Sequence, residues 1–235
     1  MTAPDALKVQ MDFGGLLLDT AGNSLLDTLG RTLLDTGWAD VVEDVLTTSP
    51  IVVFQGQRDS GPADRVADSG SIKFTLRNDA GNSAGLVGYY SPNHTNVRDG
   101  FGLGVKVRVG LEKDGSTEWF LGRIVTIEPM AGNLNDKTVD VVAADWMEIA
   151  SRTPMPNIPV MESVTDDQVI QAIVDAMDDP PSETDLAVGA YTYAYALTDV
   201  EDQETVIMTV LQRLTQSGMG RIFVVGGTGG ESLKY

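Results

Sequence analysis

The chain of 235 residues contains no cysteine and a single histidine, His94. The absence of cysteine excludes disulfides, thiolate catalysis and cysteine-ligated zinc or iron–sulfur sites. One histidine cannot build a two-histidine metal site within one chain. No run approaches the ~20 apolar residues that a membrane helix needs, and the N-terminus lacks the basic and then apolar pattern of a secretory signal. We therefore expect a soluble protein made in the cytosol, with no metal and no cofactor.

Basic residues are scarce: the chain has 16 Lys and Arg against 34 Asp and Glu, a formal net charge of −18. Such a surface repels nucleic acid and anionic membranes. Residues 153–212 contain acids but no Lys or Arg. Two interpretations stay open, a plain solvated face and a channel wall past which DNA moves without adhering. Asp178, Asp179, Glu183 and Asp185 are the candidate channel residues of the second interpretation.

Catalytic constellations are missing as well. His94 lies near Ser91 and Asp99 in the sequence, but no nucleophile elbow accompanies it. Closeness in sequence does not make a catalytic triad, because a triad is defined by its geometry. The paired carboxylates lack the sugar-stacking aromatics of a glycosidase and the ligand spacing of a calcium loop. The glycines of "VVGGTGGES" are followed neither by Lys-Ser/Thr nor by a helix, so the phosphate-loop pattern fails. We expect no catalytic residue and no enzymatic activity.

Residues 1–37 differ from the rest of the chain. The runs "LLLDT", "SLLDT" and "TLLDT" place Leu17, Leu25 and Leu33 eight residues apart, with glycines between them. The glycine density argues against a helix, and three short copies are too few for a solenoid. Exposed leucine pairs are costly. We therefore expect an extended or hairpin-forming arm, whose Leu-Asp-Thr part is ordered only against a neighbouring subunit.

From Trp38 onward the pattern is that of β-structure. The runs "SIKFTLRN" and "VKVRVGL" alternate apolar and polar residues, which is the signal of a half-buried strand. Asp114-Gly115 predicts a hairpin turn that pairs "VKVRVGL" with "WFLGRIVTIEP". "KTVDVVAADW" alternates again, and Asp145 is placed to cap a short helix. Short strands at this spacing favour a small antiparallel barrel or sandwich over residues 38–152.

Residues 153–235 predict the order helix, strand, helix, strand. "SVTDDQVIQAIVDAM" has a capping box between Thr165 and Gln168. "DQETVIMTVLQRLTQSG" repeats the apolar stripe and ends at Gly218. The runs "AYTYAYAL" and "GRIFVVGG" are the expected strands. The predicted fold class is therefore α+β and mainly β, with an arm, a small β-barrel or sandwich, and a smaller α/β domain with two helices.

Several short motifs follow one another in order over residues 38–150. They read "W-x-D-V", "G-x-x-x-x-T-L-x-N", a Ser-Pro loop, "V-x-V-x-V", "W-F-x-G-x-I" and "V-x-V-x-A-x-D". Their residues are Trp38, Asp40, Val41, Gly70, Thr75, Leu76, Asn78, Ser91, Pro92, Val105, Val107, Val109, Trp119, Phe120, Gly122, Ile124, Val139, Val141, Ala143 and Asp145. This order resembles the hub and minor tail proteins of long-tailed bacteriophages. The Leu-Asp-Thr arm has no counterpart in that pattern.

The resemblance implies a structural virion protein at the tail tip, assembled in the host cytoplasm. Such proteins look like β-barrel rings that continue the tail tube, usually trimers for hubs and hexamers for the distal ring. The implied partners are copies of the same chain, the distal tail protein, the tape measure protein and other tail-tip proteins, with DNA passing through without specific binding. Family members usually continue beyond a "G-R-x-F" strand, so a longer parent protein or a separate partner subunit is compatible with the sequence.

Two alternatives remain open. A carbohydrate-binding β-module for attachment to a host cell surface would need exposed aromatics on a concave sheet face, yet aromatics are only 6% of the chain. A glycan- or peptidoglycan-cleaving enzyme is the weaker alternative. The tail-tip hypothesis predicts symmetric rings with a wide lumen, whereas the carbohydrate-binding hypothesis predicts monomers that bind sugar.

Overall fold

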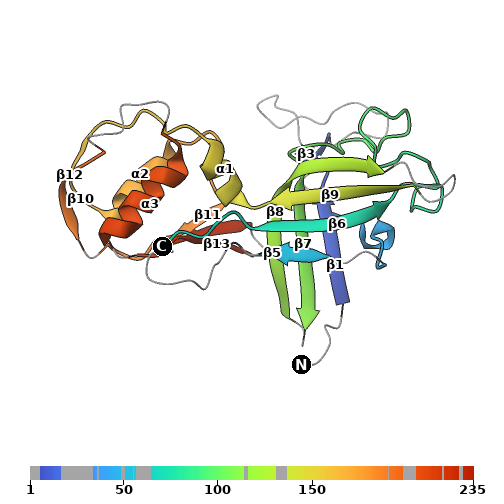
Figure 1. Ribbon diagram of the computed structural model, residues 1–235, viewed down its shortest axis with the longest axis horizontal. Coiled ribbons are helices and arrows are strands. Elements are labelled where there is room, and N and C mark those ends of the chain that lie inside the picture. The colour runs from blue at the N-terminus through green and yellow to red at the C-terminus, as the bar shows by residue number, and fades with distance from the viewer. Residues whose placement is uncertain are drawn as a thin grey trace. The chain divides into compact units, whose positions relative to one another are not determined.

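The computed structural model (Figure 1) describes residues 6–16, 34–35, 37–48, 51–54, 56, 65–113, 116–130, 137–189, 191–197, 205–218, 220–227 and 230–235. The chain divides into two compact units that each combine separate stretches. Unit 1 consists of Met1–Val52, Lys73–Thr117 and Arg123–Ala143, and unit 2 of Val53–Ile72, Glu118–Gly122 and Ala144–Tyr235. The expected division at 1–37, 38–152 and 153–235 stays a prediction.

Strands predominate over helices in the described residues, which confirms the predicted α+β, mainly β class. The first elements are β1 (Ala6–Asp12), β2 (Gly15–Leu16), β3 (Leu34–Asp35), β4 (Ala39–Asp40), the 3-10 turn η1 (Val42–Asp44), β5 (Val52–Phe54), β6 (Ser71–Arg77), β7 (Lys106–Lys113), β8 (Ser116–Met130) and β9 (Thr138–Ala144). The remaining elements are α1 (Trp146–Arg152), β10 (Met161–Thr165), α2 (Asp166–Asp175), β11 (Glu183–Asp185), β12 (Thr192–Ala196), α3 (Ile207–Gly218), β13 (Phe223–Gly226) and β14 (Glu231–Lys234).

The sheet of unit 1 closes into a small barrel. β7 lies between β1 and β8, and β9 lies between β8 and β6 (Figure 1). The segment 39–46 completes the circle because its first part, β4, pairs antiparallel with β1. Its last part reaches β6, where Val45 bridges Leu76 and Leu46 N–H donates to Thr75 O at 2.9 Å. Closure leaves few unpaired strand edges, which are sites of unwanted association.

Alternating residues fill the interior of this barrel, as the sequence pattern predicts. Successive strand side chains point to opposite faces. One face of β6 and of β9 is buried throughout, and β1, β7 and β8 each contribute buried residues. The buried residues of unit 1 include Val9, Met11, Phe74, Leu76, Val107, Val109, Ile124, Val139, Val141 and Ala143. Burial of each Val, Leu, Ile, Phe or Met side chain among them stabilises the fold by about 1.5–3 kcal/mol relative to an exposed one.

The two runs expected to form a hairpin are β7 and β8, which are neighbours in the sheet. Both are strands, so this prediction is confirmed for the described residues. The proposed turn at Asp114-Gly115 lies outside them. β8 is the longest described strand, with 15 residues, and its part Glu118–Gly122 belongs to unit 2 while its ends belong to unit 1.

Residues 6–12, which the sequence analysis includes in the extended arm, instead form a strand of this chain's own barrel. β1 makes seven antiparallel residue pairs with β7, and Val9 and Met11 are fully buried. The alternation of Leu7, Val9 and Met11 is the signal that identifies it. Most of the Leu-Asp-Thr segment, residues 17–33 and 36, lies outside the described residues. The described ends of the segment pair as β2 and β3, so Leu16 lies opposite Leu34.

Unit 2 is built around two helices, α2 and α3, as predicted. Their apolar stripes and α1 share one core, and α2 and α3 lie side by side in Figure 1. The capping box of α2 is present, since Thr165 N–H donates to Gln168 Oε1 at 3.0 Å. β13 lies between β8 and β14, and β11 pairs parallel with β14. β10 and β12 form a separate antiparallel ribbon.

Candidate functional site

The residues of the ordered motifs in 38–150 mainly make contacts that hold the fold together. Asp145 caps α1 as predicted, because its Oδ1 accepts from Met147 N–H at 3.0 Å. Its Oδ2 accepts from Gly70 N–H at 2.9 Å, across 75 residues of sequence. Asp145 is only 7% exposed, and burial raises the pKa of its carboxyl group to about 7, although the backbone N–H bonds oppose that shift. Asp145 therefore connects the residue before β6 to the first turn of α1.

Asn78, another motif residue, holds the Ser-Pro loop. Its Oδ1 accepts from Tyr90 N–H at 2.8 Å, and its Nδ2 donates to Ser91 Oγ at 2.7 Å. The Tyr90 hydroxyl in turn donates to Oδ2 of the buried Asp44 at 2.6 Å. Burial first, and then Asp44, raise the pKa of Tyr90 far above its usual range. Asp44 also accepts from the N–H and the hydroxyl of Ser83, both at 2.6 Å.

The glycine of "W-F-x-G-x-I" is explained by close packing. A Cβ atom at Gly122 would lie 2.5 Å from the carbonyl oxygen of Ala144, a distance that backbone cannot tolerate. Gly226 on β13 is restricted in the same way, since its Cβ would lie 2.3 Å from the Trp119 carbonyl oxygen. The motif thus encodes the packing of the framework and points to no reaction centre.

The single histidine also has a structural role. Its ring covers Gly88, whose φ of +82° and lack of a Cβ allow this approach. His94 Nδ1 accepts from Asn96 N–H at 3.1 Å, while Ser91 Oγ is engaged by Asn78. The polar atoms that a triad would use therefore hold the loop conformation. Among the described residues, no group of three or more His, Cys, Asp or Glu converges as a metal site.

The four predicted channel residues all belong to unit 2. Asp178 and Glu183 are exposed, and Asp179 is half-buried with its carbonyl oxygen accepting from Trp146 Nε1 at 3.1 Å. Asp185 is exposed and forms an ion pair with Lys234 at 2.6 Å. Its negative charge is therefore partly compensated by Lys234.

The strand β11 brings two of these acids onto one face. Glu183 and Asp185 alternate with Thr184, so their side chains share the face opposite to it. Thr184 is directed to α2, where its hydroxyl donates to Gln171 Oε1 at 3.0 Å. Glu183 and Asp185 consequently present an acidic strip on the side of β11 that does not contact α2.

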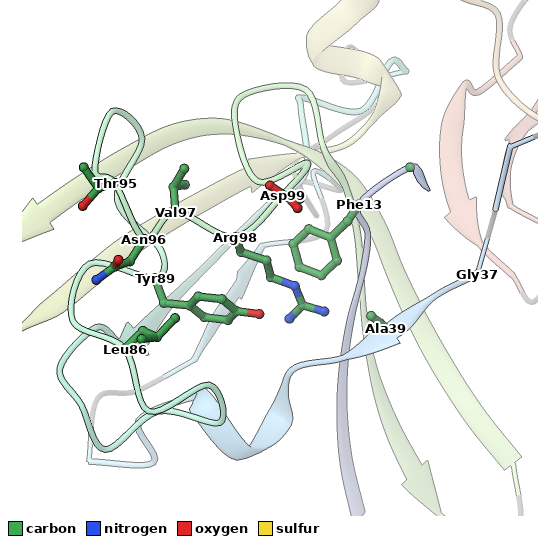
Figure 2. A pocket seen from close by; sticks show the side chains of 11 residues that line it. Phe13, Gly37, Ala39, Leu86, Tyr89, Thr95, Asn96, Val97, Arg98 and Asp99 are labelled. Carbon is green, nitrogen blue, oxygen red and sulfur yellow. The ribbon is translucent and has the colours of Figure 1, made fainter. Parts of the chain in front are cut away.

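An open pocket of about 580 Å³ lies in unit 1 (Figure 2). The Arg98 side chain extends between the rings of Phe13 and Tyr89, and its Cζ lies 3.7 Å and 5.7 Å from their centroids. Leu86 and Ala39 add apolar surface to the same pocket. No local sequence pattern predicts this site, because its residues come from distant segments and no motif marks Arg98.

Solved structures provide the comparison with known proteins. The 43 kDa tail protein of prophage MuSo2 from Shewanella oneidensis has a TM-score of 0.51 and 10% identity, over 99% of this chain and 54% of that one. The E. coli c3393 protein, a type VI secretion component with structural similarity to phage T4 tail proteins gp27 and gp5, has a TM-score of 0.46 and 10% identity over 71% and 41%. The Francisella PdpA-VgrG complex has a TM-score of 0.46 and 8% identity over 100% and 32%.

The fold is therefore of the kind found in a phage tail protein, as the motif order predicts. This chain spans about half the length of the Shewanella tail protein. No family model matches the chain, and no curated protein matches it. No helix in the described part of the chain is long and apolar enough to cross a membrane.

Proposed function

We propose that the chain is a structural protein of a phage-type tail and that it forms a hub or baseplate ring at the tail tip. The observation that carries this proposal is the fold shared with the Shewanella prophage tail protein over 99% of the chain. The order of motifs along residues 38–150 supports the same class independently of the fold. Fold alone does not define a function, so the location of the chain in a particle is the decisive test.

The roles of the polar residues support a structural function rather than an enzymatic one. Asp145, Asn78, Asp44 and His94 each hold backbone or loop groups in place. A reaction centre would instead direct such groups into a cleft. Under this proposal the protein acts through its surfaces, by joining the tail tube to the parts that recognise the host.

In a ring, Asp178, Asp179 and the acidic strip of β11 face the bore and line the path of DNA. A wall of carboxylates repels phosphates, whereas basic groups would retain them through release of counterions. Asp185 contributes least because Lys234 pairs with it. The partners in this arrangement are further copies of the chain, the distal tail protein and the tape measure protein.

The test is to locate the chain in purified phage or tail particles from cells that carry its gene. We expect an epitope tag on the chain to be labelled at one end of the tail, and cryo-electron microscopy to show a ring of the described barrel there. Deletion of the gene should leave particles without a complete tail tip. Particles with complete, infectious tails that lack the chain would contradict the proposal.

One observation favours the carbohydrate-binding alternative. Tyr195 on β12 is 62% exposed, and Tyr191, directly before β12, is 54% exposed. Exposed aromatic rings are suited to stacking on sugars. A glycan array read with the purified chain tests this alternative. Binding that is lost in Tyr195→Ala and retained in Tyr90→Phe would support an attachment role.

A further inference from the structure

The pocket in unit 1 has the chemistry of a receptor for one acidic side chain. Arg98 is stacked on Phe13, and a guanidinium retains N–H donors along its edge when its face is stacked. The ion pairs between described residues do not include Arg98. Asp99, the acidic residue in the lining, is exposed, so its charge is screened by solvent. Arg98 also shares a hydrogen bond with the Tyr90 side chain, and its remaining N–H donors are available to a carboxylate from outside the pocket.

The wall beside this cation is apolar. Leu86 is 43% exposed, and it lies in the lining together with the rings of Phe13 and Tyr89 (Figure 2). Large exposed apolar groups in a pocket of this size are typical of a binding site. A segment that carries leucine beside an aspartate fits both halves of the pocket.

The chain itself contains leucines followed by an aspartate three times, in "LLLDT", "SLLDT" and "TLLDT". Leu16 of the first copy and Leu34 of the third are paired with each other in β2 and β3. The middle copy, Ser24–Thr28, lies well away from this pair in the sequence and is therefore the copy that we consider for the pocket. Gly14 and Gly37, which flank the whole segment, both line the pocket, so the segment begins and ends at its rim.

We propose that the pocket around Arg98 binds the middle Leu-Asp-Thr repeat, Ser24–Thr28, of a second copy of this chain. Asp27 pairs with the guanidinium, and the neighbouring leucines cover the aromatic rings. One pocket and one repeat per copy give a head-to-tail contact, which closes into a ring when the rotation between copies permits. The inference rests on the proposed ring assembly, because a neighbouring copy must be present.

The experiment uses the full chain, diluted until it is monomeric, and a fluorescein-labelled peptide of residues 23–30, NSLLDTLG. We expect saturable binding in fluorescence anisotropy. The Asp27→Asn peptide should bind at least about tenfold more weakly, because a hydrogen bond to a charged group is lost. Arg98→Gln should show the same loss, Arg98→Lys a smaller one, and the exposed control Arg77→Gln none. Combining Arg98→Gln with the Asp27→Asn peptide should add no further loss.

The oligomeric state tests whether the repeat that binds the pocket comes from a second copy of the chain. By mass photometry, we expect Asp27→Asn in the full chain to lower the fraction of oligomers, and excess wild-type peptide to do the same. Absence of peptide binding, or equal binding of the Asp27→Asn or a scrambled peptide, would overturn the inference. So would unchanged oligomers in Asp27→Asn. If Arg98→Gln does not fold, the peptide substitution on the wild-type chain decides alone. Failure here leaves the particle-labelling result untouched, so the two proposals are tested separately.

Discussion

The backbone N–H of Gly70 donates to the Asp145 carboxylate at 2.9 Å, and the two residues are 75 positions apart in sequence. A Cβ atom at Gly70 would lie 2.5 Å from Asp145 Oδ2 and 3.1 Å from the Phe54 carbonyl oxygen. The carboxylate also caps α1 through Met147 N–H. A single small residue therefore permits a contact that fixes both the entry to β6 and the start of α1.

Gly70→Ala should destabilise the protein by about 2 kcal/mol or more, because the added methyl group separates a buried hydrogen bond. The free energy of unfolding from urea denaturation measures this effect. Gly102→Ala is the matched control, since nothing lies within 4 Å of its Cβ position, and it should change the free energy by less than about 0.5 kcal/mol. Equal effects of the two substitutions would contradict the packing argument.

Asp145 should make stability depend on pH. Burial raises the pKa of its carboxyl group from 3.8 to about 7, so the folded state binds more protons than the unfolded state between these values. The free energy of unfolding should then fall as pH rises from about 4 to 7, with a slope of up to about 1.4 kcal/mol per pH unit. Urea denaturation at several pH values measures the slope. Asp145→Asn should reduce it, and an unchanged slope would show that other groups cause it.

Tyr90→Phe should cost about 1–3 kcal/mol of stability, because the buried Asp44 loses the hydroxyl that donates to it at 2.6 Å. The midpoint of thermal unfolding reports the change. Tyr195→Phe serves as the control because Tyr195 is 62% exposed, and its hydroxyl group should contribute little. A thermal midpoint that stays the same in Tyr90→Phe would mean that Ser83 satisfies Asp44 without help.

Charge reversal on the acidic strip should impair passage of DNA. Asp178→Lys with Glu183→Lys places basic groups where the proposal puts the channel wall, and basic groups retain phosphates in a salt-dependent way. We expect slower DNA ejection from intact particles, with the strongest effect at low salt. Glu43→Lys, an exposed acid of unit 1, is the control. Equal ejection rates in both variants would place the strip away from the bore.

The Leu-Asp-Thr segment should be the first site of proteolysis in the isolated chain. We expect limited digestion to cut within residues 14–37 before any other region, because the sequence of this segment has too many glycines among its leucines to fold alone. Mass spectrometry of the first fragments identifies the site. Protection of this region in a chain proven to be monomeric would count against an arm that is ordered only by a neighbour.

The local parts of this fold could be predicted from local signals. Alternation identifies β6, where Ile72, Phe74 and Leu76 are all buried. Capping chemistry identifies the starts of α1 and α2 at Asp145 and Thr165. These features depend on neighbours within a few positions, so the sequence pattern contains them fully.

The non-local parts could not be predicted in this way. Nothing in "STEWFLGRIVTIEPM" indicates that Glu118–Gly122 belongs to unit 2 while the ends of the strand belong to unit 1. The pocket joins Phe13, Tyr89 and Arg98 from separate segments, and the composition of each segment alone is unremarkable. The sequence shows how many acidic residues the chain has but not which face of a strand each occupies. That face is set by packing, such as the contact of Thr184 with Gln171.

β1 can pair with β7 only after the ribosome has made the residues between them. Gln10 and Arg108, which face each other across these strands, are 98 residues apart. At about 5–20 residues per second, a nascent β1 waits roughly 5–20 s for its partner to be made. During that interval its apolar face and the edge that pairs with β7 are exposed to other chains, whereas its other edge can already pair with β4 through Gln10 and Asp40. When many copies are made at once, this free edge can pair with a neighbouring nascent chain before its own β7 has been made.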